Sequence, residues 1–447
     1  MTVPPREQWG SRLGFTLAAV GSAVGLGNIW RFSYVVGEHG GAAFLLMYVL
    51  VLVVMGLPVM IAELVIGRRA QSDAVGAFET LAPGRPWVIA GYLSVGAALV
   101  ILSYYAVIGG WVVRYLAGYL SGGVTSATVG SHDAFFSAFI AETFAPLAWS
   151  FAFMAVTTLI VVMGVRRGIE WANRILMPLL ALLLVAMAAY SLSLPGAGGG
   201  LRFLFAPDWT VFAQGEAYLA AVGQAFFSLS LGMGALLTYG SYLPRSTALP
   251  GAAVRIVTLD FLVALVAGLV IFPAVFAFAI DPATGATLVF IVLPGIFEAM
   301  PGGTVVGVAF FVLLAAAALS SAVSLLEVVV AYAMRRLRWT RRRAGLAFGA
   351  LIFVLGIFSS LGYGRLDHVS LFGRPILDGL DLAASQVVLP LGGLLFALFI
   401  GWGWQRSVAL QEAGFTGKRL GALWLFTLRY LTPLLVVLVL LRSLGVL

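Results

Sequence analysis

The stretch "GSAVGLGNIW", residues 21–30, places Gly21, Gly25 and Gly27 inside one of the most apolar regions of the chain. Glycine weakens a helix by roughly 1 kcal/mol relative to alanine. The residues on either side otherwise have the composition of a helix that spans a membrane. The sequence therefore predicts a first span that is interrupted near its middle.

The composition of the 447-residue chain is that of a polytopic membrane protein. Hydrophobic residues make up 62% of it and charged residues only 10%, and the mean hydropathy is +1.05, whereas soluble domains carry about a quarter charged residues. The chain has no cysteine, and its three histidines lack the spacing of metal ligands. No nucleophile–base or metal constellation is present, so we expect no enzyme. The net charge of +8 comes with arginines interleaved between apolar spans, so we expect a lipid bilayer and not nucleic acid as the partner.

Eleven segments are apolar for about the 20 residues that a helix needs to cross a bilayer. They are predicted at about 12–36, 42–67, 87–120, 147–164, 171–192, 216–242, 253–280, 304–336, 344–362, 378–404 and 421–445. Since no soluble domain, proline-rich linker or low-complexity tract separates them, residues 1–447 are interpreted as a single transmembrane domain. The polar start, "MTVPPREQWGSR", is too long for a cleaved signal peptide, so the first span is expected to be retained.

Arginine and lysine are distributed unevenly between the loops. The segments "GRRAQ", "VRRGIEWANR" and "RRLRWTRRR" follow spans 2, 4 and 8, and further basic residues follow span 10, whereas the loop at 120–146 has neither arginine nor lysine. Basic loops stay in the cytoplasm. We therefore expect a multi-pass protein of the cell (inner) membrane with a cytoplasmic N-terminus and an extracytoplasmic C-terminus.

A second interruption occurs five spans after the first. The segment "GQAFFSLSLGMGALLTYGSY", residues 223–242, carries Gly232 and Gly234 within an apolar run. Glycine-interrupted spans at corresponding positions of two halves indicate an inverted-repeat transporter, in which unwound backbone lines a site at mid-membrane. The predicted fold class is all-α integral membrane, with eleven transmembrane helices, a 5+5 inverted repeat and discontinuous helices 1 and 6. The repeats are expected at about 12–192 and about 216–404, followed by an extra helix at about 421–445.

These glycines have two other interpretations. Small residues in membrane helices often serve only close packing. A single interrupted span could be explained in this way, but two interruptions at corresponding positions favour the transporter interpretation over the packing one. A dinucleotide-binding interpretation of "GLGN" fails, because no strand precedes it.

The segments that contain these interruptions resemble those of the neurotransmitter:sodium symporter family. Its members are sodium- and chloride-dependent transporters that share the fold of the bacterial leucine transporter. "WGSRLGFTLAAVGSAVGLGNIWRFSY", "HGGAAFLLMY" and "GLPVMIAELVIGR" are similar to its first two helices. "GQAFFSLSLGMGALLTYGSYL", "LDFLVALVAGLVIFP" and "ALSSAVSLLEVVVAY" are similar to helices 6, 7 and 8. The likeness covers most of the chain, with the motifs in the family's order.

The resemblance implies two sodium sites. The residues it implies for site 1 are Ala23, Asn28, Ser228 and Asp260, together with the substrate carboxylate. For site 2 they are Gly21, Val24, Ala317, Ser320 and Ser321. Without the family, paired serines favour hydroxyls bonded to their own helix, whereas an intramembrane Asp260 is a functional candidate by default.

The resemblance also implies a substrate pocket. Its expected residues are Ala23, Gly25, Gly27, Ile101, Tyr105, Phe227, Ser228, Ser230, Met233, Ser321, Ser324 and Leu325. Amides near Gly25 and Gly27 and the Tyr105 hydroxyl are expected to bind a carboxylate, helped by the positive end of a broken helix. No fixed charge is expected at the side-chain end, which favours a small neutral, hydrophobic amino acid. Met233 stands where the leucine transporter has an aromatic residue, and its flexibility favours a larger or broader range of substrates.

Gate residues follow from the same likeness: Arg31 and Asp381 on the outside, with Phe227 as the lid, and Arg6, Trp9 and Tyr242 on the inside. Arg335 stands where the family has the inner-gate carboxylate, so either Glu327 or Glu63 replaces that acid or the inner gate is weaker. Gly168 and Pro178 match a helix-5 motif whose unwinding would admit water to sodium site 2.

The function expected from these residues is a sodium-coupled symporter that imports a neutral, hydrophobic amino acid by alternating access. Chloride is not expected as a cofactor, because Ala264 replaces the serine of chloride-dependent relatives and Asp260 supplies a negative charge. The alternative is a transport-dead amino-acid sensor or receptor on the same fold. A channel is less favoured, since no ring of polar residues lines a pore.

Overall fold

The computed structural model describes residues 7–124, 130–282 and 288–443, most of which are helical. The elements up to the fourth span are α1 (Arg12–Ala23), η1 (Gly27–Arg31), α2 (Phe32–Glu38), α3 (Ala42–Val51), η2 (Leu52–Gly56), α4 (Leu57–Ala70), α5 (Ala74–Leu81), α6 (Val88–Leu120), α8 (His132–Ala141) and α9 (Ala145–Val162). The next are η3 (Val165–Glu170), α10 (Trp171–Leu192), α11 (Gly198–Phe205), η4 (Trp209–Ala213), α12 (Gly215–Ser228), α13 (Ala235–Gly240), α14 (Leu249–Ala277), α15 (Val292–Ala299) and α16 (Gly303–Arg336).

The last part of the chain contains a short antiparallel hairpin and three further spans. Its elements are α17 (Arg341–Leu361), β1 (Ser370–Leu371), β2 (Arg374–Pro375), α18 (Ile376–Ala383), η6 (Ala384–Val388), α19 (Leu389–Leu398), η7 (Phe399–Gly403), α20 (Arg406–Glu412), α21 (Arg419–Phe426), η8 (Thr427–Leu431) and α22 (Thr432–Ser443). The η segments are π-helical turns, except η4, which is a 3-10 helix.

The spans confirm the predicted fold class. Nine continuous helical segments in the described ranges are long and apolar enough to cross a membrane. The first span is a pair, α1 and η1–α2, bent by 51°, and the sixth is divided into α12 and α13. Most spans begin and end within a few residues of the prediction. The fifth begins at Val165 instead of 171, because η3 continues directly into α10.

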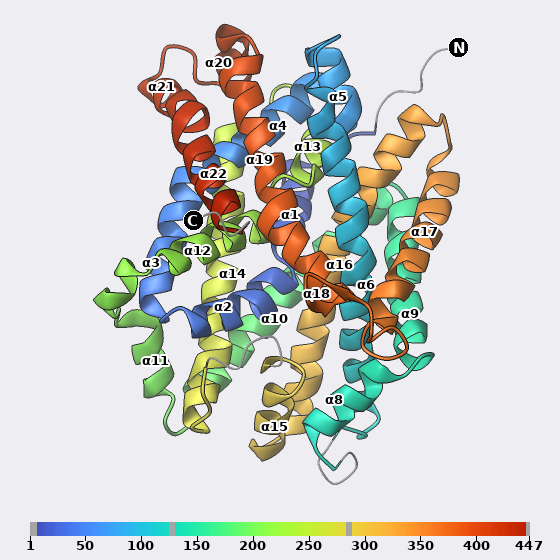
Figure 1. The fold of residues 1–447 in the computed structure, drawn as a ribbon, viewed down its shortest axis with the longest axis vertical. Helices are drawn as coiled ribbons and strands as arrows, with labels where there is room; N and C mark the ends of the chain where they lie inside the picture. Colours follow the sequence, from blue (N-terminus) through green and yellow to red (C-terminus); the bar gives the residue numbers. More distant parts are fainter. Residues whose placement is uncertain (1–6, 125–129, 283–287, 444–447) are drawn as a thin grey trace.

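The loops lie at two opposite ends of the molecule. Figure 1 shows α5 and α20 at one end and α8 and α15 at the other. The first two belong to the basic connections after spans 2 and 10, and α8 belongs to the loop without arginine or lysine. The connections therefore alternate between the ends as the charge pattern predicts.

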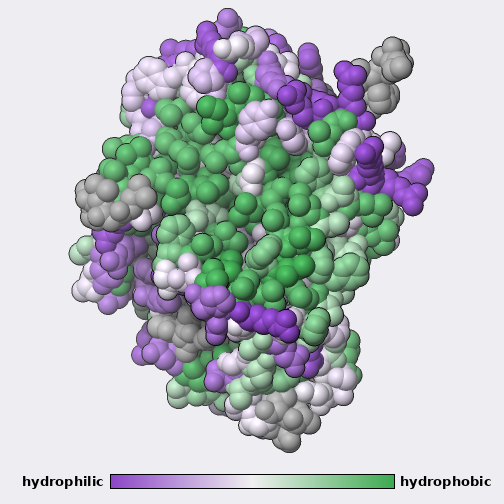
Figure 2. Space-filling model, turned by 45° about the vertical axis from the view of Figure 1, so that its right-hand side comes forward, coloured by the Kyte–Doolittle hydropathy of each residue, from purple (hydrophilic) through white to green (hydrophobic). Residues whose placement is uncertain are grey.

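The middle of the molecule has an apolar surface. Figure 2 shows a hydrophobic band between two more hydrophilic ends. Large apolar side chains are exposed on several helices, among them Leu159 on α9, Leu182 on α10 and Leu351 on α17. In water such a surface would be unfavourable, and in lipid it is the expected exterior.

α6 is the central helix of the bundle. The most apolar window of Val88–Leu120 is 83% buried, against 33% for Val165–Leu192, and α6 packs against α5, α9, α16 and α17. The broken first span packs against α10, α14 and α16. The two interruptions therefore lie inside the bundle, where their backbone groups meet protein and not lipid.

Candidate substrate and cation site

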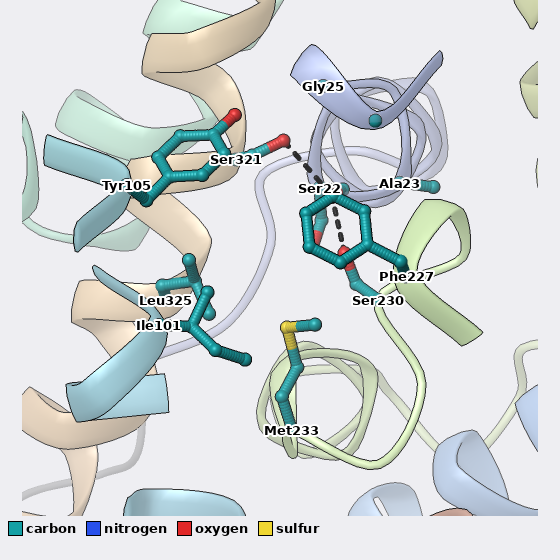
Figure 3. Close-up of a pocket in the computed structure, with 11 residues that line it drawn as sticks. Ser22, Ala23, Gly25, Ile101, Tyr105, Phe227, Ser230, Met233, Ser321 and Leu325 are labelled. Carbon is teal, nitrogen blue, oxygen red and sulfur yellow. Dashed lines mark hydrogen bonds between the residues drawn. The ribbon is translucent and has the colours of Figure 1, made fainter. Parts of the chain in front are cut away.

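A pocket lies where the two broken spans meet α6 and α16 (Figure 3). The lining residues are Ser22, Ala23, Gly25, Gly27, Ile101, Tyr105, Phe227, Ser230, Met233, Ser321 and Leu325. Four elements from different parts of the chain thus contribute to one cavity, which is mostly apolar at the side formed by Ile101, Met233 and Leu325.

The end of α1 provides backbone acceptors to the pocket. The last carbonyls of a helix have no partner within it, and the chain leaves the helix at Val24, whose φ of −75° and ψ of 103° are extended. Side-chain hydroxyls from other elements bond these carbonyls: Ser230 Oγ donates to Ser22 O at 2.7 Å and Ser321 Oγ to Ser22 O at 3.3 Å. The break therefore exposes carbonyl oxygens that a continuous helix would keep for itself.

The start of the second half-helix provides amides. Leu26 N donates to Tyr105 Oη at 3.3 Å, and Gly25 N donates to Asn28 Oδ1 at 3.1 Å. A side chain at Gly25 would not fit, because an added Cβ would lie 2.4 Å from Ser321 Oγ. Amides, the Tyr105 hydroxyl and the positive end of a half-helix together form a suitable site for a carboxylate. Leu26 was not itself among the predicted residues, but it lies between Gly25 and Gly27, near which such amides were expected.

Asn28, Ser228 and Asp260 form a buried polar cluster next to the pocket. Asn28 Nδ2 lies 2.7 Å from Asp260 Oδ1 and 2.9 Å from Ser228 Oγ, and Ser228 Oγ donates to Asp260 Oδ2 at 2.9 Å. All three are at most 1% exposed. In the described ranges Asp260 has hydrogen bonds to neutral groups but no ion pair. A buried, ionised carboxylate without a basic partner is unfavourable unless a proton or a metal cation neutralises it, and the oxygen-rich surroundings of Asp260 fit a small hard cation.

The predicted second sodium site is a set of oxygens between α1 and α16. Ser320 Oγ lies 2.9 Å from Ala317 O and 3.3 Å from Val24 O, so its one proton can be donated to either, and Ser321 Oγ lies 3.4 Å from Gly21 O. Both interpretations of the paired serines are thus present, since Ser320 bonds its own helix and also reaches the first span. Hydroxyl and carbonyl oxygens of this kind are the donors that hard cations prefer.

The predicted pocket residues line this cavity, except two. Ser228 belongs to the Asn28–Asp260 cluster, and Ser324 donates to Ser321 O at 2.8 Å behind the lining. Ser22, which the prediction missed, lines the pocket and also donates its hydroxyl to Ser324 Oγ at 2.8 Å. Its position directly before Ala23 in the interrupted segment is the signal that could have identified it.

On one side of the pocket, Phe227 lies beneath Arg31. The Arg31 guanidinium is 4.9 Å from the centre of the Phe227 ring, and its Nη1 donates to Gln224 Oε1 at 3.4 Å. In the described ranges Arg31 forms no ion pair within 4.0 Å with Asp381, which instead accepts a hydrogen bond from Tyr104 Oη at 3.0 Å. The outer pair that the resemblance implies is therefore not formed in this structure.

On the other side of the pocket, Glu327 is the buried carboxylate. Tyr242 Oη donates to Glu327 Oε1 at 2.5 Å, and Arg341 Nη1 donates to Glu327 Oε2 at 2.5 Å. Trp9 Nε1 donates to Tyr239 O at 3.0 Å, and the Trp9 ring contacts Tyr242 edge-on. Of the two acids proposed to replace the missing carboxylate, the structure places Glu327 here. The predicted gate residue Arg6 lies outside the described residues.

Arg335 and Glu63 have other partners. Arg335 pairs with Asp73, whose side chain also caps the start of α5, and with Glu79 at 2.8 Å. Glu63 Oε1 accepts a hydrogen bond from Gly232 N at 2.7 Å in the unwound part of the sixth span. Glu63 therefore supports the interruption and does not contact Tyr242 or Arg341.

Comparison with known proteins agrees with this geometry. The model of the sodium:neurotransmitter symporter family matches residues 6–130 and 140–447. The chain belongs to this family. It is accordingly a membrane transporter of the secondary type and not an enzyme.

Three relatives illustrate the likeness. The uncharacterized sodium-dependent transporter YhdH of Bacillus subtilis is 40% identical, over 98% of each chain. An uncharacterized sodium-dependent transporter of Haemophilus influenzae is 33% identical, again over 98% of each chain. The crystal structure of MhsT in complex with L-phenylalanine is 55% identical and superposes with a TM-score of 0.93, covering 98% of this chain and 100% of that one.

Proposed function

We propose that this symporter-family member couples the inward movement of sodium to the import of a neutral, hydrophobic amino acid by alternating access. The observation that carries the proposal is the pocket between the two broken spans, with amides at one side, carbonyls at another and an apolar end. The complex of MhsT with L-phenylalanine supports an amino acid of this class.

The Asn28–Asp260 cluster supplies the coupling in this proposal. Ala23 lines the pocket, and Asn28 is hydrogen-bonded to Gly25 N within the same interruption. A cation held by Asn28, Ser228 and Asp260 would lie next to the substrate carboxylate, so each would stabilise the other. Site 2 would tie α1 to α16 through Gly21, Val24, Ala317, Ser320 and Ser321.

Alternating access requires that the two sides of the pocket open in turn. Phe227 and Arg31 form the barrier on one side, and Trp9, Tyr242 and Glu327 form it on the other. With basic loops inside, the Glu327 side faces the cytoplasm. We place the N-terminus in the cytoplasm and the C-terminus outside the cell membrane on the same argument.

A thermal-shift screen of the twenty amino acids, in sodium and in choline, identifies the substrate. A ligand that binds the folded state stabilises it by mass action, so a substrate should raise the melting temperature more in sodium than in choline. Uptake into proteoliposomes then separates transport from a sensor on the same fold. A sensor would bind the amino acid without sodium-driven accumulation.

Replacing Asn28 with alanine should weaken sodium and substrate binding together, because linkage between two ligands is reciprocal. Dissociation constants for substrate, measured over a range of sodium concentrations, check this. Ser33→Ala is a matched control, since Ser33 is buried in the same span but bonds only its own helix at Ile29 O. Equal substrate affinity in sodium and in choline for the unmodified protein would contradict symport.

A further inference from the structure

Asn173 is a fully buried amide that the site described above does not use. It lies on α10, shortly after the π-helical turn η3, where α10 packs against both α1 and α16. These are the two elements that contribute the oxygens of the predicted second sodium site. Asn173 therefore comes from a third element that adjoins this set.

The orientation of the Asn173 amide is set by η3. Its Nδ2 donates to Ile169 O at 2.9 Å, and Ile169 lies within η3. If Nδ2 and Oδ1 exchanged places, Asn173 Oδ1 would face Ile169 O, and two oxygen acceptors cannot form a hydrogen bond with each other. Oδ1 is consequently directed away from α10, toward the first span.

Gly21 is the residue that meets this oxygen. A Cβ added to Gly21 would lie 2.0 Å from Asn173 Oδ1 and 3.2 Å from Ser320 Cβ. Asn173 Oδ1 thus occupies the space that a side chain at Gly21 would fill, next to one of the two predicted serine ligands. Because residue 21 is a glycine, Asn173 Oδ1 on α10 can approach the α1 backbone.

Asn173 Oδ1 has no hydrogen-bond donor among the described residues, although it is completely buried. A buried acceptor that lacks a donor is unfavourable, and such an oxygen is favoured where a cation or a cation-bound water is nearby. The surrounding hydroxyls of Ser320 and Ser321 donate to backbone carbonyls instead.

We propose that Asn173 Oδ1 is part of the second sodium site, as an oxygen contributed by the fifth span, and that its Nδ2 bond to Ile169 O links occupancy of that site to η3. The inference rests on the proposed function, since it requires that sodium binds between α1 and α16. With sodium present, Asn173 Oδ1 would contact the ion while Nδ2 donates to Ile169 O. Without sodium, only the hydrogen bond from Nδ2 to Ile169 O in η3 remains.

The test is a sodium titration of thermal stability, without amino acid, at constant ionic strength with choline. It is performed in an Asn28→Ala background, so that the first site does not contribute. Asn173→Ala should raise the sodium concentration at half-maximal stabilisation by about tenfold, as for other groups that support a metal site. Asn173→Ser, which also withdraws the amide oxygen, is the second variant if alanine does not fold.

Ser191→Ala is the matched control. Ser191 lies on the same helix, is 3% exposed and has a hydroxyl without a partner among the described residues, but it is about five turns from Asn173. It should leave the sodium midpoint unchanged. An unchanged midpoint in both Asn173 variants, or an equal increase in Ser191→Ala, overturns the inference.

Hydrogen exchange of the unmodified protein provides an independent readout. Sodium should slow exchange of the amides at 168–173 relative to choline, and Asn173→Ala should abolish that protection. Absence of sodium-dependent protection there overturns the link to η3. If sodium has no effect on the unmodified protein at all, the proposed function fails as well, whereas a sodium effect that Asn173→Ala leaves intact overturns only this inference.

Discussion

Met233 lines the apolar end of the pocket, and we expect it to limit the size of the substrate side chain. It is 4% exposed and points into the cavity from the unwound part of the sixth span (Figure 3). Met233→Phe adds a rigid ring to a closely packed space, so it should disfavour bulky aromatic substrates more than leucine-sized ones, by roughly 1–3 kcal/mol. Competition assays with leucine, methionine, phenylalanine and tryptophan measure the effect.

The matched variant for this test is Met187→Phe, an equally buried methionine on α10 that does not line the pocket. It should leave the order of substrate preference unchanged. If Met233→Phe also leaves that order unchanged, Met233 does not limit substrate size.

Glu327 is the residue on which the proposed inner barrier depends, through its contacts with Tyr242 and Arg341. Glu327→Gln keeps the size of the side chain but leaves Arg341, whose side chain is 10% exposed, without its buried counter-charge. Breaking a buried pair in this way costs about 3–5 kcal/mol, so the inner side should open more often. Because the chain has no cysteine, a single Thr238→Cys can report this as faster labelling by a thiol reagent.

Glu79→Gln is the control for Glu327. It removes a carboxylate from the Arg335 pair, where the Glu79 side chain is 38% exposed, and exposed pairs contribute little. Labelling at Thr238→Cys should then remain slow. Equal labelling rates in the two variants would argue against a gating role for Glu327.

At the scale of elements, the interruption of the sixth span depends on backbone conformations that favour glycine. Gly232 has φ of +83°, and a Cβ there would lie 2.2 Å from Leu389 O. Gly232→Ala should therefore lower the melting temperature, because it combines a left-handed backbone, costing about 1–2 kcal/mol for alanine, with a clash against α19. Thermal unfolding in detergent checks it.

Gly223→Ala on α12 provides the comparison. This glycine is helical, and beyond its own helix backbone no described residue lies within 4 Å of an added Cβ, so alanine should be neutral or stabilise by about 0.5–1 kcal/mol. Opposite shifts of the two variants are expected. Equal shifts would mean that the backbone at Gly232 tolerates a side chain.

The elements were predictable from sequence to the extent that they depend on local pattern. Apolar length predicted the eleven spans, and glycines within apolar runs predicted the two breaks. The sequence narrowed the acid beside Tyr242 to Glu327 or Glu63, but the choice between them was not predictable, because Glu327 is paired with Arg341 on a different helix and Arg335 is paired with Asp73. The same holds for Asn173, whose oxygen matters only through the tertiary packing that brings Gly21 beside it.

At the scale of the whole molecule, transport should not require chloride. Ala264 is buried one turn after Asp260 on α14 and offers no hydroxyl, while the Asp260 carboxylate carries the negative charge that would balance sodium. Uptake into proteoliposomes should persist when gluconate replaces chloride. Strict dependence on chloride in the unmodified protein would refute this proposal.

The converse variant tests the same balance of charge. Asp260→Asn together with Ala264→Ser removes the carboxylate and adds a hydroxyl, so uptake should become dependent on chloride. Ala267→Ser, another buried position on α14, is the control for the added hydroxyl. With Asp260→Asn, it should not produce chloride dependence.

The inverted repeat belongs to the confirmed fold class, whereas the bounds of its halves, at about 12–192 and about 216–404, remain a prediction. Its consequence is geometric: two breaks meet at one depth, and the chain contributes helix ends of opposite polarity to one cavity. That cavity has amides near Leu26, carbonyls near Ser22 and an apolar wall at Met233. An amino acid whose carboxylate, amine and side chain meet these three groups in one closed cavity is bound with a single arrangement of substituents about its Cα. We therefore expect the transporter to be stereoselective and to favour one enantiomer of each amino acid, with two of the three contacts supplied by the unwound backbone.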